Sequence, residues 1–193
     1  MKTKLTNSLN VATILVLVVL TFVSCGNKQQ KTFSNDKDVL EVKAPSSDIH
    51  SVVFMGDIKS VKQHIVAGTN LNAKDQYGST PLTIAVTFGK TEIAKALILG
   101  GADLNLKNNE GSTALHTASF FCRTEIVKVL LEQGADKTLE NNYGATALES
   151  VASSFKEVKP IYEQIAKQLG PLGLKLDFKF IEATRPVIAD MLK

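Results

Sequence analysis

A spacing of 33 residues runs through the middle of the chain and constrains its fold more than any other feature. Four columns of matching residues keep this spacing: Gly68, Gly101 and Gly134; Gly78, Gly111 and Gly144; Thr80, Thr113 and Thr146; and Leu82, Leu115 and Leu148. A fixed period of this length is typical of a solenoid, because each unit is too small to bury its own apolar face and must stack on its neighbours.

Each unit is predicted to contain two short helices. Thr80 and Thr113 stand where a side chain can cap the first helix, Pro81 suits its first position, and Ser47 holds the capping column in the first unit. Thr146 with Glu149 predicts a capping box in the last unit. The recurring glycines fall at helix ends and in turns, where we expect positive φ angles.

The segments "STPLTIA", "STALHTA", "TEIAKALILGGADLN" and "TEIVKVLLEQGAD" resemble the ankyrin repeat. This resemblance implies an all-α solenoid of paired antiparallel helices joined by hairpin-like loops. About four repeats are expected, at residues 46–78, 79–111, 112–144 and 145–170. In the last of them Ile161, within "KPIYEQIAKQLG", stands in for Ile126 of the third repeat.

The two ends of the repeat array are expected to differ from its middle. Gln63 and His64 in the first repeat indicate a polar outer face, as an end repeat needs for solubility. Residues 171–193 are expected to form a C-terminal cap or tail. Its alternating apolar residues, at 174, 176, 178 and 180, predict an edge strand, and residues 181–193 predict a short helix broken near Pro186.

The N-terminus has the order of a secretory signal, with Lys2 and Lys4 before an apolar run over 11–23. That run is shorter than the roughly 20 residues that span a bilayer. The segment "FVSCGN" resembles the lipobox of bacterial lipoproteins, although Phe22 replaces the usual Leu. The resemblance implies a signal peptide over 1–24, a lipid on Cys25 and a flexible tether over 25–45. An uncleaved anchor or a buried apolar helix is the alternative.

Charge and motifs give little support to nucleic-acid binding or catalysis. The chain carries a net charge of +3, and residues 1–24 contain two lysines and no acid. The remaining residues therefore lack the excess of basic side chains that nucleic-acid binding requires. His50 and His116 share a column two repeats apart, which is too far to share a metal ion. Cys122 is expected to be buried. We therefore predict no enzyme, no metal, no cofactor and no small-molecule substrate.

Bulky apolar residues recur where the ankyrin pattern places the concave groove and its rim. These candidate partner-binding residues are Phe54, Met55, Tyr77, Phe88, Phe120, Phe121 and Tyr143. Two interpretations stay open: the side chains complete a small core, or they form an apolar groove that a protein partner covers.

The ankyrin resemblance implies a non-enzymatic module that binds a partner protein in its concave groove. The lipobox resemblance implies that a lipid on Cys25 tethers this module to a membrane of a bacterial envelope, facing the periplasm. An immunity or inhibitor protein that blocks a toxin or enzyme is one alternative. A structural envelope-assembly lipoprotein, with its groove filled by its own C-terminal segment "LDFKFIEA", is another.

Overall fold

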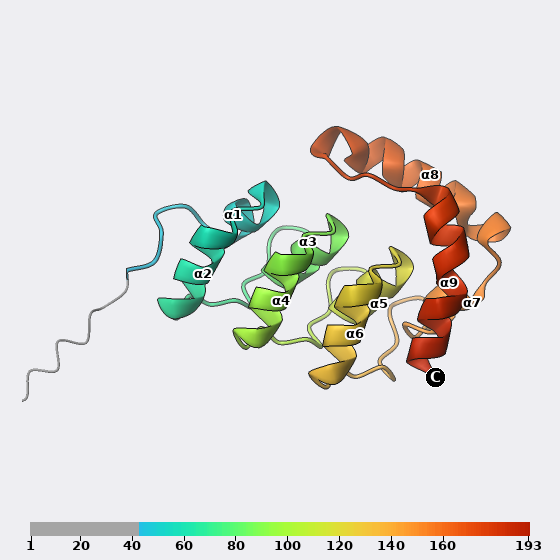
Figure 1. Cartoon of the computed structure of the whole chain (residues 1–193), viewed down its shortest axis with the longest axis horizontal. Helices are drawn as coiled ribbons and strands as arrows, with labels where there is room; N and C mark the ends of the chain where they lie inside the picture. Colours follow the sequence, from blue (N-terminus) through green and yellow to red (C-terminus); the bar gives the residue numbers. More distant parts are fainter. Residues whose placement is uncertain (1–42) are drawn as a thin grey trace, which may run out of the picture. The chain divides into compact units, whose positions relative to one another are not determined.

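The computed structural model describes residues 43–193 (Figure 1). The expected signal peptide over 1–24, the lipid site at Cys25 and nearly all of the expected tether lie outside the described residues. Within the described part, every element of regular structure is a helix. The predicted all-α class is therefore confirmed.

Three helix pairs stand in a row along the chain (Figure 1). They are α1 (Ile49–Met55) with α2 (Ile58–Val66), α3 (Pro81–Thr87) with α4 (Thr91–Leu99), and α5 (Ala114–Phe120) with α6 (Thr124–Glu132). The first helices α1, α3 and α5 pack side by side, and so do the second helices α2, α4 and α6. One apolar core runs through all the pairs, as a stacked solenoid requires.

The capping threonines begin their helices as expected. Thr80 Oγ1 accepts a hydrogen bond from the Thr83 amide at 3.2 Å, with Pro81 in the first turn, and Thr113 Oγ1 accepts one from the His116 amide at 3.4 Å. Because the side-chain oxygen satisfies an amide that has no partner inside the helix, each cap fixes where its helix starts.

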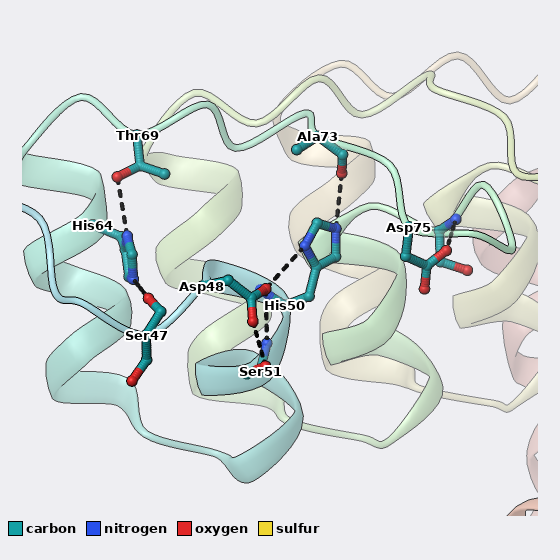
Figure 2. Close-up of polar contacts among 9 residues, drawn as sticks. Ser47, Asp48, His50, Ser51, His64, Thr69, Ala73 and Asp75 are labelled. Atoms are coloured by element: carbon teal, nitrogen blue, oxygen red, sulfur yellow. Dashed lines mark hydrogen bonds and ion pairs between the residues drawn. The ribbon is translucent and has the colours of Figure 1, made fainter.

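The first repeat is capped differently from the expectation (Figure 2). Asp48, not Ser47, caps α1, and its carboxylate accepts from the amides of His50 and Ser51. The Ser47 carbonyl instead accepts a hydrogen bond from His64 Nε2 at 2.9 Å, while His64 Nδ1 lies 3.0 Å from Thr69 Oγ1. The expectation of a polar outer face is therefore wrong at His64, which is buried, and its two hydrogen bonds satisfy both ring nitrogens there.

The turn glycines adopt the expected left-handed conformation. Gly78 and Gly111 have φ angles of +70° and +74°. A Cβ at either position would lie 2.4 Å from a side-chain oxygen, of Asn109 and Asn142 respectively. The turns thus need glycine both for the sign of φ and for the close approach of the next repeat.

The fourth repeat differs most from the expectation. It consists of α7 (Glu149–Ala152) and α9 (Phe178–Leu192): α7 packs beside α5, and α9 packs on α6 and α7. Helix α8 (Phe155–Leu169) and the short 3-10 helix η2 (Gly170–Leu172) are inserted between them. The segment "KPIYEQIAKQLG" therefore belongs to the insertion, and the assignment of Ile161 to the place of Ile126 is wrong.

The predicted edge strand and broken helix are both replaced by α9. Asp177 caps this helix by accepting from the Phe180 amide at 3.1 Å, so the alternating apolar residues fall partly in a loop and partly in the first helical turn. The helix continues through Pro186. Pro186 and Glu182 are both exposed, so solvent can bond to the carbonyl that proline leaves without a helical donor.

Candidate partner-binding groove

A groove runs along the inner face of the solenoid, and the inserted helix α8 crosses it. In Figure 1, α8 leaves the fourth repeat and extends back above α5 and α3. Between α8 and the repeats lie two adjoining cavities of about 470 and 780 Å³. Both cavities are lined by Ser79, Thr87, Asn108, Glu110 and Leu169. The groove is therefore a partly covered channel within the described residues.

The covering side of this channel, here called the roof, is an apolar stripe. It consists of Val158, Ile161, Ile165 and Leu169 of α8 with Leu172 of η2. Residues three or four apart lie on one face of a helix, so this spacing turns the stripe toward the repeats. Ile161 and Leu172 keep 49% and 54% of their surface exposed. The roof therefore presents uncovered apolar area to the channel.

The opposite side, here called the floor, comes from the first helices of the repeats. Its apolar members are Phe54 of α1, Ile84 of α3, Phe88 at the end of α3, and Phe120 and Phe121 at the end of α5. Phe54 packs edge-on against Phe88, with ring centroids 5.0 Å apart, and stays 39% exposed. The apolar surfaces of floor and roof thus face one another across the two cavities.

A buried tyrosine anchors α8 at the base of the roof. The Tyr162 hydroxyl donates to the Phe120 carbonyl oxygen at 2.5 Å and accepts from Arg185 Nη1 at 2.9 Å. The Tyr162 ring stacks on the Phe120 ring, with the two ring centroids 4.4 Å apart. Burial raises the pKa of Tyr162 to about 12, so the hydroxyl stays protonated.

Arg185 completes this anchor from α9. Its Nη2 donates to the carbonyl oxygens of Ser153 at 3.0 Å and Ser150 at 3.4 Å, at the end of α7. A cation at this place satisfies carbonyls that have no helical donor. The buried Arg185 side chain therefore ties together α7, α8 and α9.

The candidate residues at the end of α5 are less available than those elsewhere. Phe121 is 6% exposed; its ring lies 5.2 Å from the Phe120 ring and 5.8 Å from the Arg123 guanidinium carbon. Phe120 is half-buried beneath Tyr162. Phe120 thus joins α8 to the repeats, and Phe121 packs beside it.

The remaining candidates are more exposed. Tyr77 and Tyr143 lie on turns at the mouth of the channel and are 66% and 79% exposed. Met55 is 78% exposed but lines neither cavity. The structure thus brings Phe54, Tyr77, Phe88 and Tyr143 to the channel with accessible surface, and leaves Met55 outside it.

Sequence reasoning missed the roof, although its signal was present. Apolar residues recur at helical spacing over 158–169, and the 33-residue period predicts the second helix of a fourth repeat for them. Nothing in that spacing says which surface the stripe faces. That choice depends on α9 taking the outer place and on the anchor formed by Tyr162 and Arg185.

The charged side chains that line the channel are acidic. They are Asp75 at one end, Glu110 in the middle and Glu149 at the other end, and within residues 43–193 no lysine or arginine lines either cavity. Hydrogen bonds from the amide and hydroxyl of Thr146 lower the pKa of Glu149, which favours its charged form. His116 also lines the channel, and burial lowers its pKa.

His50 and His116 make hydrogen bonds that hold the backbone of the repeats in place. Ser51 donates its hydroxyl to Asp48 rather than to His50, and His50 Nε2 lies 3.0 Å from the Ala73 carbonyl oxygen (Figure 2). His116 bonds to Thr113 and to the Ala145 carbonyl oxygen. A nucleophile and its base would instead share a hydrogen bond.

Cys122 is buried as predicted, at 1% exposure, and its Sγ lies 3.7 Å from the Ile181 carbonyl oxygen. Burial raises the pKa of this thiol to about 11. In the part of the chain that the structure describes, no group of three or more His, Cys, Asp or Glu is placed to hold a metal ion. No helix among residues 43–193 has the length and hydropathy of a membrane span.

Comparison with known proteins supports the repeat assignment. Residues 49–141 match the family model for ankyrin repeats, in three copies. No curated protein matches the chain. The match covers the three helix pairs from α1 to α6, whose stacking is that of a helical-repeat solenoid. Residues 49–141 are thus ankyrin repeats, and the fold is an ankyrin-repeat solenoid.

Proposed function

We propose that this protein is a non-catalytic binding module that holds a segment of a partner protein in the channel between the floor and the roof. Ankyrin repeats are generally protein–protein interaction modules, and this supports the general class. The observation that carries the proposal is the apolar surface left uncovered on both sides of one channel. Phe54 on the floor, and Ile161 and Leu172 on the roof, each keep more than a third of their surface exposed. Apolar area gathered in this way is typical of an interaction site.

The proposed place of action is a bacterial envelope, with the protein held to a membrane by a lipid on Cys25 and facing the periplasm. The support for this part of the proposal is the sequence over 1–25 alone. Incorporation of an alkyne-labelled fatty acid tests it. We expect label on the full chain and none on Cys25→Ser, whereas equal labelling of both would refute the lipid site.

Photo-crosslinking in cells tests the channel as the binding site. The photoreactive amino acid benzoylphenylalanine is placed at Tyr77 or Tyr143, which are exposed at the channel. Control positions are Val66 and Leu99, which are also exposed, at 67% and 71%, but line neither cavity. We expect a discrete crosslinked partner from the channel positions and none from the controls. Equal crosslinking at all four positions, or none at the channel positions, would refute the proposal.

The structural alternative, in which the chain fills its own groove with residues 176–183, loses its support. Those residues form the start of α9 and the loop before it, and α9 packs on α5, α6 and α7. The inserted helix α8 covers the groove instead and leaves the two cavities beneath it.

A further inference from the structure

We infer that the channel selects an extended polypeptide segment in which lysine or arginine alternates with aliphatic side chains. This inference rests on the proposed function and deepens it by naming the chemistry of the partner.

The shape of the channel favours an extended chain over a folded surface. A folded domain that binds an open groove needs free access along its length, but here α8 crosses above α3 and α5 (Figure 1). The cavities beneath it, of about 470 and 780 Å³, are of the size that encloses a small ligand or a few side chains. The apolar roof and floor on either side of them would contact aliphatic side chains of the occupant.

The charges along the channel favour a basic occupant. Asp75, Glu110 and Glu149 lie along the channel, and no lysine or arginine among the described residues is part of its lining; Arg123 is bonded to the carbonyl oxygen of the lining residue Thr87, at 3.2 Å. Like charges gathered beside low-dielectric walls attract the opposite charge more strongly than charges on an open surface do. In an extended segment that alternates the two kinds of residue, the aliphatic side chains share one side and the basic side chains the other. The aliphatic side chains would then meet the roof or the floor, while the basic side chains pair with these acids.

The fold does not require the charge of Asp75. Its Oδ1 accepts from the amides of Tyr77 and Ser79, each at 2.8 Å. Asn108 and Asn141, 33 and 66 residues further on, make the same pair of bonds through their own Oδ1. An amide oxygen therefore serves the turn as well as a carboxylate, and the negative charge at position 75 is free to act on an occupant.

Glu110 supports the same conclusion from the second turn. It holds the column that Tyr77 and Tyr143 hold in the other turns, and it is exposed. Its backbone amide bonds to Asn108, which fixes the turn. Neutralising Asp75 and Glu110 together is therefore expected to leave the solenoid folded.

Fluorescence anisotropy with three short labelled peptides of equal length tests the inference. One alternates lysine with leucine, one glutamate with leucine, and one lysine with serine. The full chain is held in nanodiscs of uncharged phosphatidylcholine, with empty nanodiscs as the blank. We expect the lysine–leucine peptide to bind about tenfold more tightly than either other peptide.

Matched variants locate the effect in the channel. Asp75→Asn/Glu110→Gln is expected to weaken lysine–leucine binding about tenfold at low salt and to flatten its salt dependence. Glu132→Gln/Glu182→Gln makes the same change in net charge outside both cavities, and is expected to bind like the parent chain. Equal weakening by the two double variants, or equal binding of the glutamate–leucine peptide, would overturn the inference.

The failure of this inference can be told apart from the failure of the proposed function. If crosslinking at Tyr77 and Tyr143 captures a partner through an acidic segment, the proposed function stands and the inferred chemistry is wrong. If crosslinking in cells captures nothing while the lysine–leucine peptide binds as expected, the chemistry stands and the cellular function is wrong.

Discussion

The anchor of α8 makes the most direct test of the structure, through the substitution Tyr162→Phe. This change removes one hydroxyl and keeps the ring that stacks on Phe120. The hydroxyl donates to the Phe120 carbonyl and accepts from the Arg185 guanidinium, and Tyr162 is fully buried. Both partners therefore lose a hydrogen bond at a place from which solvent is excluded.

The expected loss in the free energy of unfolding follows from those two hydrogen bonds. A neutral hydrogen bond contributes about 1 kcal/mol to stability, and one to a charged group about 1.5–3 kcal/mol. Arg185 keeps its bonds to the carbonyls of Ser150 and Ser153, and the phenyl ring is more apolar than the phenol, so part of the loss is offset. We expect the free energy of unfolding to fall by about 2 kcal/mol, which corresponds to about 4–8 °C in melting temperature.

Urea unfolding followed by circular dichroism measures this loss, and hydrogen exchange locates it. Exchange is expected to speed up over 155–172 and to stay unchanged in α3 and α4, because only the inserted segment depends on the anchor. Tyr143→Phe is the matched control; Tyr143 is 79% exposed, so its loss should stay within about 0.5 kcal/mol. Equal effects of the two substitutions would refute the proposed anchor.

Two further predictions concern the turns and the buried thiol. Gly78→Ala and Gly144→Ala both place a Cβ at positive φ, which costs about 1 kcal/mol of stability. Only at Gly78 would that Cβ also lie 2.9 Å from a backbone nitrogen, that of Asn109. Gly78→Ala should therefore lower the urea midpoint more than Gly144→Ala, and equal shifts would contradict the close approach of the two repeats. Burial raises the pKa of Cys122 from 9.0 to about 11. Its neutral form therefore contributes stability that is complete below pH 9 and is lost as the pH rises to about 11. Cys122→Ala should flatten the dependence of the free energy of unfolding on pH over that range, and a dependence unchanged by the substitution would count against the shift.

The predictions for the repeats succeeded because local chemistry decides them. Thr80 and Thr113 can cap a helix wherever the chain places them, since each cap bond spans three residues. Gly78 and Gly111 adopt positive φ because the turn itself demands it. These local signals recur every 33 residues in several columns, which chance does not produce. The recurrence therefore predicts the all-α solenoid.

The exposure of the candidate site residues could not be predicted from the sequence, because burial is a property of the assembled fold. Phe120 holds the same repeat column as Phe54, yet Phe120 is half-buried while Phe54 stays 39% exposed. The difference comes from Tyr162, 42 residues beyond Phe120, which stacks on its ring and bonds to its carbonyl. No repeat column carries that information.

By itself, the sequence determined the repeat period, the helix pairs of the first three repeats, the threonine caps of the second and third repeats, and the turn glycines. Only the tertiary structure decided that α9 completes the fourth repeat and that α8 turns back to cover the groove. The physical reason is that an apolar stripe such as 158–169 specifies that a helix needs a partner surface, but not which surface. The buried contacts of Arg185, between α7, α8 and α9, select one arrangement from those that the stripe would allow.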